Sequence, residues 1–117
     1  MFHSDTQTLI DTWTALGETA AIPDRARLDP TRLGLLLPRA FMAVRRGDGA
    51  VFRLAGGWIE TFHGDRLAGT AWLTWWSETS RPLVVDAITR TFREARPVVI
   101  VAGAGDDETA LEITLTP

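Results

Sequence analysis

Two segments far apart in the sequence constrain the fold most, because each consists of two β-prone runs joined by a short loop. In the first, residues 41–44 and 51–55 flank the loop 46–49, Arg-Gly-Asp-Gly. An Asp-Gly pair between such runs is typical of a β-hairpin, because both residues tolerate positive φ. In the second, the runs are residues 98–102 and 111–116. We therefore expect two antiparallel hairpins.

The two runs of the second hairpin differ in character. Residues 98–102 are apolar at every position, which predicts a strand covered on both faces. Leu111, Ile113 and Leu115 alternate with polar residues, which predicts a half-exposed strand. The loop 103–108 is rich in glycine and acidic residues, as expected for a turn exposed to solvent.

The first residues of the chain predict an amphipathic helix. Ser4 and Gln7 have the spacing of a capping box, in which each side chain satisfies a free backbone donor, so the helix should begin near Asp5. Gly17 can adopt the left-handed conformation that ends it. An apolar stripe follows the three- and four-residue spacing of a helix, and its members are Leu9, Ile10, Trp13 and Leu16.

Short helices are expected on both sides of the first hairpin. Asp29 is a suitable N-cap, and Pro30 has the backbone angle of a first helical residue. Leu28 and Leu33 have the spacing of a hydrophobic staple across this helix start. Pro38 should end the helix. Residues 58–62 place their apolar side chains on one side of a short helix that ends at Gly64.

A short helical or irregular segment at residues 71–76 precedes the longest predicted helix. This helix carries Pro82 in its first turn and ends before Pro97. Its buried face should consist of Val84, Val85, Ile88, Phe92 and Ala95.

The composition excludes several kinds of chemistry. All twelve basic residues are arginine, and the chain has no lysine and no cysteine. A thiolate nucleophile, a thiol redox switch, a cysteinyl flavin adduct and a lysine Schiff base are therefore excluded. The arginines are scattered and the net charge is −3, which argues against a nucleic-acid partner. No apolar stretch approaches the roughly 20 residues of a membrane span, and no secretory signal pattern is present, so we expect a cytoplasmic protein without a membrane partner.

Few residues suggest catalysis or metal binding. His63 and Asp65 could form an acid/base pair, but both flank a turn glycine, where polar residues are expected anyway. The two histidines and the acidic residues 106–108 do not have the spacing of a metal site. Residues 103–105 begin like a dinucleotide-binding motif, but Glu108 occupies the place of its third glycine. We therefore expect no catalytic residue and no metal.

Four of the five tryptophans lie within the nineteen residues from Trp58 to Trp76. Each can bury roughly 150–250 Å². Beside a sheet, such a cluster either fills the core or lines a cavity. Trp72, Trp75 and Trp76 cannot all face inward, so at least one should be partly exposed.

The order of the elements predicts an α+β fold, with an antiparallel sheet covered by helices on one face. It resembles the PAS domain, and the likeness is most specific over residues 38–76, PRAFMAVRRGDGAVFRLAGGWIETFHGDRLAGTAWLTWW. This stretch is similar to a branch of short PAS proteins from alphaproteobacteria. The resemblance covers roughly residues 29–117, which leaves residues 1–28 as an N-terminal helix and its connection.

This resemblance implies a non-enzymatic sensory or protein-interaction module, which can hold a small apolar ligand between its sheet and helices. The alternatives are a PAS domain whose own tryptophans fill the pocket, and a small enzyme that uses His63 and Asp65. Haem-binding relatives place a histidine on the long helix, and photoreceptors that form a flavin adduct need a cysteine. This sequence has neither, so no cofactor is expected. The residues that the resemblance assigns to the pocket are Trp58, Phe62, Leu67, Trp72, Ile88 and Phe92.

A PAS sheet ordinarily has five strands, with the fifth between the first and the fourth, but only four can be placed before Pro117. Either the sequence is a piece of a longer chain, or the count is wrong, or another segment fills the gap. That segment could be the N-terminal residues, a second chain or a peptide, because folded proteins avoid unpaired strand edges. We therefore predict a homodimer, with the stripe from Leu9 to Leu16 as a second contact surface.

Overall fold

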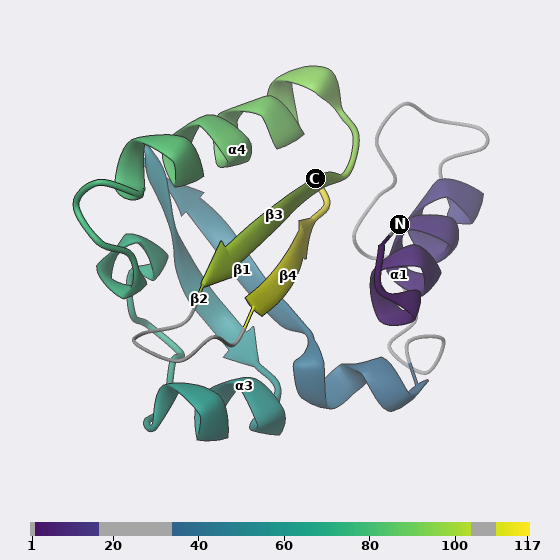
Figure 1. Ribbon diagram of the computed structural model, residues 1–117, viewed down its shortest axis with the longest axis horizontal. Coiled ribbons are helices and arrows are strands. Elements are labelled where there is room, and N and C mark those ends of the chain that lie inside the picture. Colours follow the sequence, from purple (N-terminus) through teal and green to yellow (C-terminus); the bar gives the residue numbers. More distant parts are fainter. Residues whose placement is uncertain (1, 17–33, 104–109) are drawn as a thin grey trace. The chain divides into compact units, whose positions relative to one another are not determined.

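The computed structural model describes residues 2–16, 34–103 and 110–117 (Figure 1). They fall into two compact units, one of Leu33–Asp86 and the other of Met1–Arg32 with Ala87–Pro117. The α+β class predicted from the sequence is confirmed. In chain order the elements are α1 (Ser4–Leu16), η2 (Gly34–Arg39), β1 (Phe41–Arg46), β2 (Gly49–Ala55), α3 (Gly57–His63), η3 (Trp72–Trp75), α4 (Arg81–Glu94), β3 (Val98–Gly103) and β4 (Ala110–Leu115), where η denotes a 3-10 helix.

The strands β1 and β2 form the first predicted hairpin. They pair antiparallel from Phe41 opposite Ala55 to Arg46 opposite Gly49, with an irregularity in the register after Met42. The turn therefore consists of Gly47 and Asp48, inside the predicted loop 46–49, and both strands extend further toward it than the predicted runs 41–44 and 51–55. Only Gly47 needs a positive φ, at 55°, because Gly49 already belongs to the strand.

The backbone at Gly56, just before α3, packs directly against the backbone of η2. The N–H of Gly56 donates a hydrogen bond of 2.8 Å to the carbonyl of Ala40. A Cβ atom at Gly56 would collide with the backbone carbonyl groups of Leu37 and Pro38. Glycine is required here because η2 lies directly against this position. At the other end, Gly64 closes α3 with φ 96° and donates to the carbonyl of Glu60, as predicted.

The core of the Leu33–Asp86 unit is mainly aromatic. Phe52, Leu67 and Trp72 are at most 1% exposed, and Ile59 and Val84 are also buried. The segment before η3 adds to the first hairpin, because Phe52 donates to Thr70 and accepts from Gly69 along the backbone. These bonds extend the ladder on the far side of β2 and position η3 over it.

The long helix α4 is present as predicted, but only Val84 and Ile88 of the five residues expected on its buried face are buried. Val85 is half-buried, and Ala95 follows the last helical residue with a positive φ of 53°. Val84, Ala87, Ile88 and Thr91 are buried, whereas Phe92 is 41% exposed. At 3.6 residues per turn, Thr91 lies about 20° from Val84 around the helix and Phe92 about 80° away. The Thr91 hydroxyl donates to the carbonyl of Ala87, so the helix itself satisfies this buried polar group.

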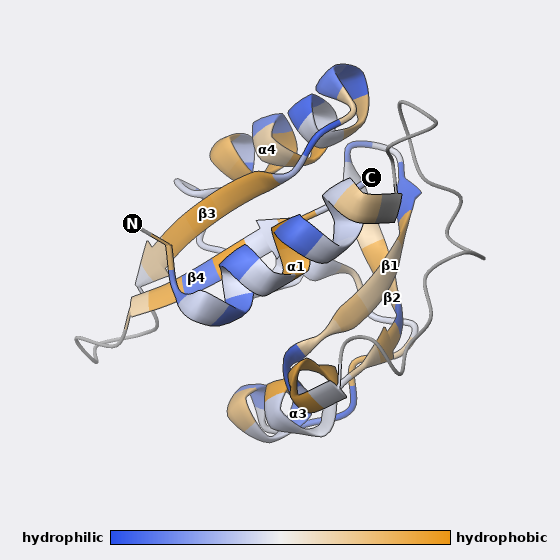
Figure 2. Cartoon of the chain, turned by 90° about the vertical axis from the view of Figure 1, so that its right-hand side faces the viewer, coloured by the Kyte–Doolittle hydropathy of each residue, from blue (hydrophilic) through white to orange (hydrophobic). Residues whose placement is uncertain are grey.

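The strands β3 and β4 form the second predicted hairpin, from Val98 opposite Leu115 to Gly103 opposite Ala110. Figure 2 shows β3 as an almost uninterrupted hydrophobic strand. The prediction that residues 98–102 are covered on both faces was wrong, because Val101 is 73% exposed. Each hairpin is a two-stranded antiparallel sheet.

Helix α1 begins at Ser4, close to the predicted start near Asp5, but its cap differs from the prediction. The Nδ1 atom of His3 accepts the N–H of Asp5 at 3.1 Å and acts as the cap. The predicted capping box does not form, since the side chain of Gln7 donates to Asp11 instead.

The 3-10 helix η2 contains Pro38, which was expected to end a helix. In a helix this short, the missing N–H of Pro38 breaks no longer ladder of hydrogen bonds. The predictions at Gly17, Leu28, Asp29-Pro30, Leu33 and the loop 104–108 lie outside the described residues. None of the described helices is long and apolar enough to cross a membrane.

The two adjacent glycines before α3 provide a matched test of this packing. We expect Gly56→Ala to lower the free energy of unfolding by about 1–3 kcal/mol, because the new methyl group meets rigid backbone. Gly57→Ala should raise it by up to about 1 kcal/mol, because no atom lies within 4 Å and alanine favours the helix. Urea unfolding followed by tryptophan fluorescence measures both. Equal effects of the two substitutions would contradict the proposed role of Gly56.

Candidate functional site

Six side-chain rings form a continuous row in the Leu33–Asp86 unit. The row crosses four elements, since its members come from β1, β2, η3 and α3, with Trp76 directly after η3. Neighbouring ring centroids are 5.2–5.8 Å apart, within the range of favourable aromatic contacts. In order along the row the rings are Trp76, Trp72, Phe41, Phe52, Trp75 and His63.

Three tryptophans of this row carry polar atoms without partners. The indole nitrogens of Trp72, Trp75 and Trp76 are buried, and none donates a hydrogen bond. A buried donor without an acceptor is costly, by roughly 1–3 kcal/mol, and native proteins usually supply an acceptor from protein, water or a bound molecule. This part of the core is therefore suited to an apolar group that carries an acceptor oxygen.

The six predicted pocket residues divide into two groups. Leu67, Trp72 and Ile88 are buried, whereas Trp58, Phe62 and Phe92 are 41–45% exposed. Of the six, the structure brings together Trp58 and Phe62 of α3, which stack with centroids 5.3 Å apart and planes 10° apart.

The guanidinium of Arg39 lies 5.2 Å from the centre of the Trp58 ring, a cation–π contact that connects η2 to the exposed pair.

Four members of the ring row were not predicted as site residues. Phe41 and Phe52 were identified only as strand residues, and Trp75 and Trp76 only as members of a group of three neighbouring tryptophans. Phe52 lies on the strand directly opposite Ala43, so alternation along β2 could have indicated an inward position. The contact between His63 and Trp75 joins residues of different elements and has no signal in the sequence.

His63 and Asp65 do not form the acid/base pair considered from the sequence. Both are exposed, and no hydrogen bond or ion pair between these two described residues is present. The imidazole stacks on Trp75, with centroids 5.2 Å apart and planes 17° apart. The Asp65 carboxylate accepts the neighbouring N–H of Arg66 at 2.7 Å. Within residues 2–16, 34–103 and 110–117, no group of acidic residues and histidines could hold a metal ion.

The start of α1 is joined to β4 through Glu112. One carboxylate oxygen of Glu112 accepts the N–H of His3 at 2.8 Å, and the carboxylate also accepts a hydrogen bond from the side chain of Thr6. These bonds, first that of Thr6 and then that of His3, lower the pKa of Glu112 below its ordinary value of 4.5. A carboxylate beside a helix N-terminus is also favoured by the helix dipole.

The predicted interaction stripe lies on the side of α1 that contains Thr6. Leu9, Ile10 and Trp13 are half-buried, and the side chain of Leu16 is outside the described part. Trp13 also has a buried indole nitrogen without an acceptor. Because Thr6 contacts Glu112, part of the stripe is turned toward the hairpin of the same chain.

In the sequence, short helices and one long helix lie between two β-hairpins, which is an α+β order of elements. A family model described as the PAS domain matches residues 1–117, and the chain belongs to this family. The match includes residues 1–28, which the sequence analysis set apart from the domain. PAS domains are generally non-enzymatic sensory modules and commonly mediate protein interaction. Comparison with curated proteins and with solved structures gave no match.

The Glu112 contact predicts a pH dependence of α1. Because the pKa of Glu112 is lowered in the folded protein, its stabilising contribution is present above the ordinary pKa of 4.5 and is lost as the pH falls through the lowered value. His3 is the histidine that faces the Glu112 carboxylate. The Nδ1 atom of its imidazole also lies 3.9 Å from a carboxylate oxygen of Asp5. We expect Glu112→Gln to weaken the protection of α1 amides against hydrogen exchange near neutral pH. In the variant, this protection should also fall less when the pH is lowered, because the group that is protonated in acid has been removed.

The matched control is Glu78→Gln, which neutralises another exposed carboxylate. It should leave the pH dependence of α1 amide exchange as in the unmodified protein. A Glu112→Gln protein whose α1 amides exchange as in the unmodified protein at every pH would show that this contact does not hold α1.

Proposed function

We propose that this PAS domain is a non-enzymatic regulatory module of the cytoplasm that pairs with a second copy of itself and responds to a small, largely apolar ligand. The family match over the whole chain supports the regulatory role. The position of the three indole donors supports the ligand. Binding would act by favouring one packing of the helices over another, which changes the surface offered to a partner.

The ligand would occupy the neighbourhood of the ring row. Its apolar part would contact the aromatic faces, and an oxygen would accept hydrogen bonds from the indoles of Trp72, Trp75 or Trp76. Leu67 and Trp72 are the predicted pocket residues of this unit that are buried, so they are the best candidates for the pocket wall. Trp58 and Phe62 would lie at its exposed side.

The partner surface that we propose is α1. Its stripe of Leu9, Ile10 and Trp13 is half-buried, so apolar area remains to be covered by a second copy. A second copy that covers this area through the same stripe would make the protein a dimer.

Catalysis by His63 and Asp65 is the alternative, and the geometry favours it less. An orienting carboxylate should hydrogen-bond to the imidazole of a general base. Here Asp65 is engaged with the backbone of Arg66, and His63 stacks on Trp75.

Native mass spectrometry of the purified protein tests the module directly. We expect a dimer that carries an additional small molecule, released on denaturation. Leu9→Glu should give a folded monomer, because it places a charge on the stripe. The control Ala15→Glu, on the opposite side of α1, should remain dimeric. A monomer at all concentrations would exclude the dimer, and a dimer of bare chains after gentle isolation would exclude a retained ligand.

A second substitution separates the module from the enzyme. We expect His63→Ala to keep the dimer and any ligand mass, because the imidazole lies at the end of the ring row and is exposed. The same mass spectra measure both. Loss of the dimer and of the ligand in a variant that still shows the far-ultraviolet circular dichroism of the parent would contradict this assignment. A reaction catalysed by the parent and abolished in His63→Ala would establish the enzyme instead.

A further inference from the structure

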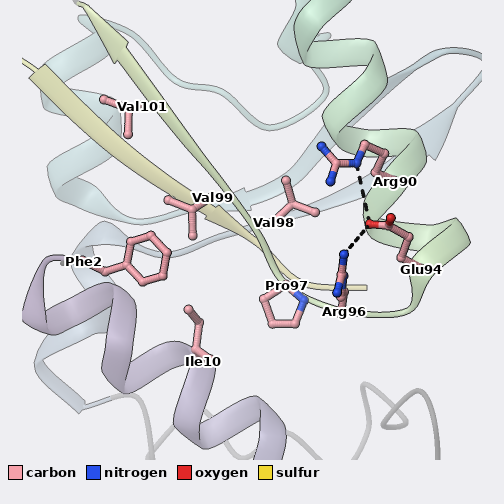
Figure 3. Close-up of a pocket in the computed structure, with 9 residues that line it drawn as sticks. All are labelled: Phe2, Ile10, Arg90, Glu94, Arg96, Pro97, Val98, Val99 and Val101. Carbon is pink, nitrogen blue, oxygen red and sulfur yellow. Dashed lines mark ion pairs between the residues drawn. The ribbon is translucent and has the colours of Figure 1, made fainter.

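An open groove lies in the unit that contains α1 and the second hairpin. Its cavity volume is about 450 Å³, within the range of small-molecule sites. Ile10 of α1 and Phe2, which precedes α1, line one side of the groove (Figure 3). Val99 and Val101 of β3 line the other side. The groove shares no residue with the ring row, and all its residues belong to one compact unit.

The apolar wall of the groove is incompletely covered. Phe2 is 48% exposed and Val101 is 73% exposed. Val101 stands directly opposite Glu112 in the strand register, next to the place where His3 and Glu112 join α1 to β4. The helix is therefore held at its first turn, and apolar surface of β3 stays in contact with water. Removing this surface from water favours an apolar occupant.

The other end of the groove is positively charged. The Nε atom of Arg90 and an Nη atom of Arg96 lie 3.6 and 3.4 Å from the same carboxylate oxygen of Glu94, as the dashed lines in Figure 3 show. Two guanidinium groups thus share one carboxylate, which leaves an excess of one positive charge.

The distances in this triad are longer than those of good hydrogen bonds, and the side chains of Arg90 and Arg96 are 43% and 64% exposed. Their remaining N–H donors can turn toward an incoming anion. A guanidinium presents paired donors that match the two oxygens of a carboxylate.

We propose that this groove binds one amphiphilic carboxylate, with its alkyl chain along Phe2, Ile10 and Val99 and its head group at Arg90 and Arg96. The apolar wall favours a ligand with an alkyl chain, and the positively charged end favours a negatively charged head group. Glu94 opposes the anion, but it also holds the two arginines in position, and the net charge of the three groups favours binding. The bound chain would join Phe2 and Ile10 to β3 and so restrain α1. This inference does not rest on the proposed function.

Decanoate, kept below its micelle concentration, is the probe. Calorimetric titration of the full chain should give saturable binding of one molecule per chain, and decyltrimethylammonium, with an equal chain and the opposite charge, should bind at least tenfold more weakly. The double substitution Arg90→Gln with Arg96→Gln should weaken decanoate binding at least tenfold. The control Arg93→Gln changes an arginine of α4 that does not line the groove, and it should change the affinity less than twofold.

Val101→Ser tests the apolar wall, and because this side chain is largely exposed the variant should fold. It should weaken decanoate binding severalfold without altering the preference for an anion. Trp76→Phe, in the other unit, should leave decanoate binding unchanged, which separates this site from the ligand of the ring row. Equal binding of the two amphiphiles, full affinity in the double variant, or binding to anionic vesicles but not to monomeric decanoate would overturn the proposal.

Discussion

The packing of aromatic rings around Phe52 and Trp72 is the interaction on which the unit of residues 33–86 depends. These two side chains are almost fully buried, and each contacts Phe41. Through these contacts the row connects both strands of the first hairpin with η3, and Trp75 extends it to α3. Each such pair contributes roughly 0.5–1.5 kcal/mol beyond the burial of its area. Elements as short as η3 and α3 are not stable alone, so these ring contacts hold them in place.

What could be predicted from the sequence was determined by local chemistry. The glycines at residues 47, 56 and 64 mark the turn of the first hairpin and both ends of α3, because each occupies a place where a side chain would be strained or would clash. The apolar periodicity gave α4, and the apolar runs gave all four described strands. These signals act over a few residues, so they locate the first hairpin but not the full length of its strands, which extend to Arg46 and from Gly49.

The features that were missed depend on residues far apart in the chain. His3 and Glu112 are separated by 109 positions, and nothing in either segment indicates that they meet. Phe92 was assigned to the buried face of α4 because it is large and apolar, but the geometry of the helix gives that place to Thr91. In these cases tertiary packing outweighed the preference of the single residue.

Buried polar groups that lack a hydrogen-bond partner say more about function here than the helices and strands do. Natural proteins pair most buried donors and balance most partly buried charges, and exceptions concentrate at sites that bind something else. The unit of residues 33–86 has its exceptions at three indole nitrogens, and the other unit has them at the indole nitrogen of Trp13 and the hydroxyl of Thr114. In that other unit the exposed side chains of Arg90 and Arg96 also share the single carboxylate of Glu94. A phenylalanine at such a position would remove the unpaired donor, but it would also leave a cavity where the larger indole packs. The unpaired donors and the excess charge beside apolar surface are therefore the observations on which both ligand proposals rest.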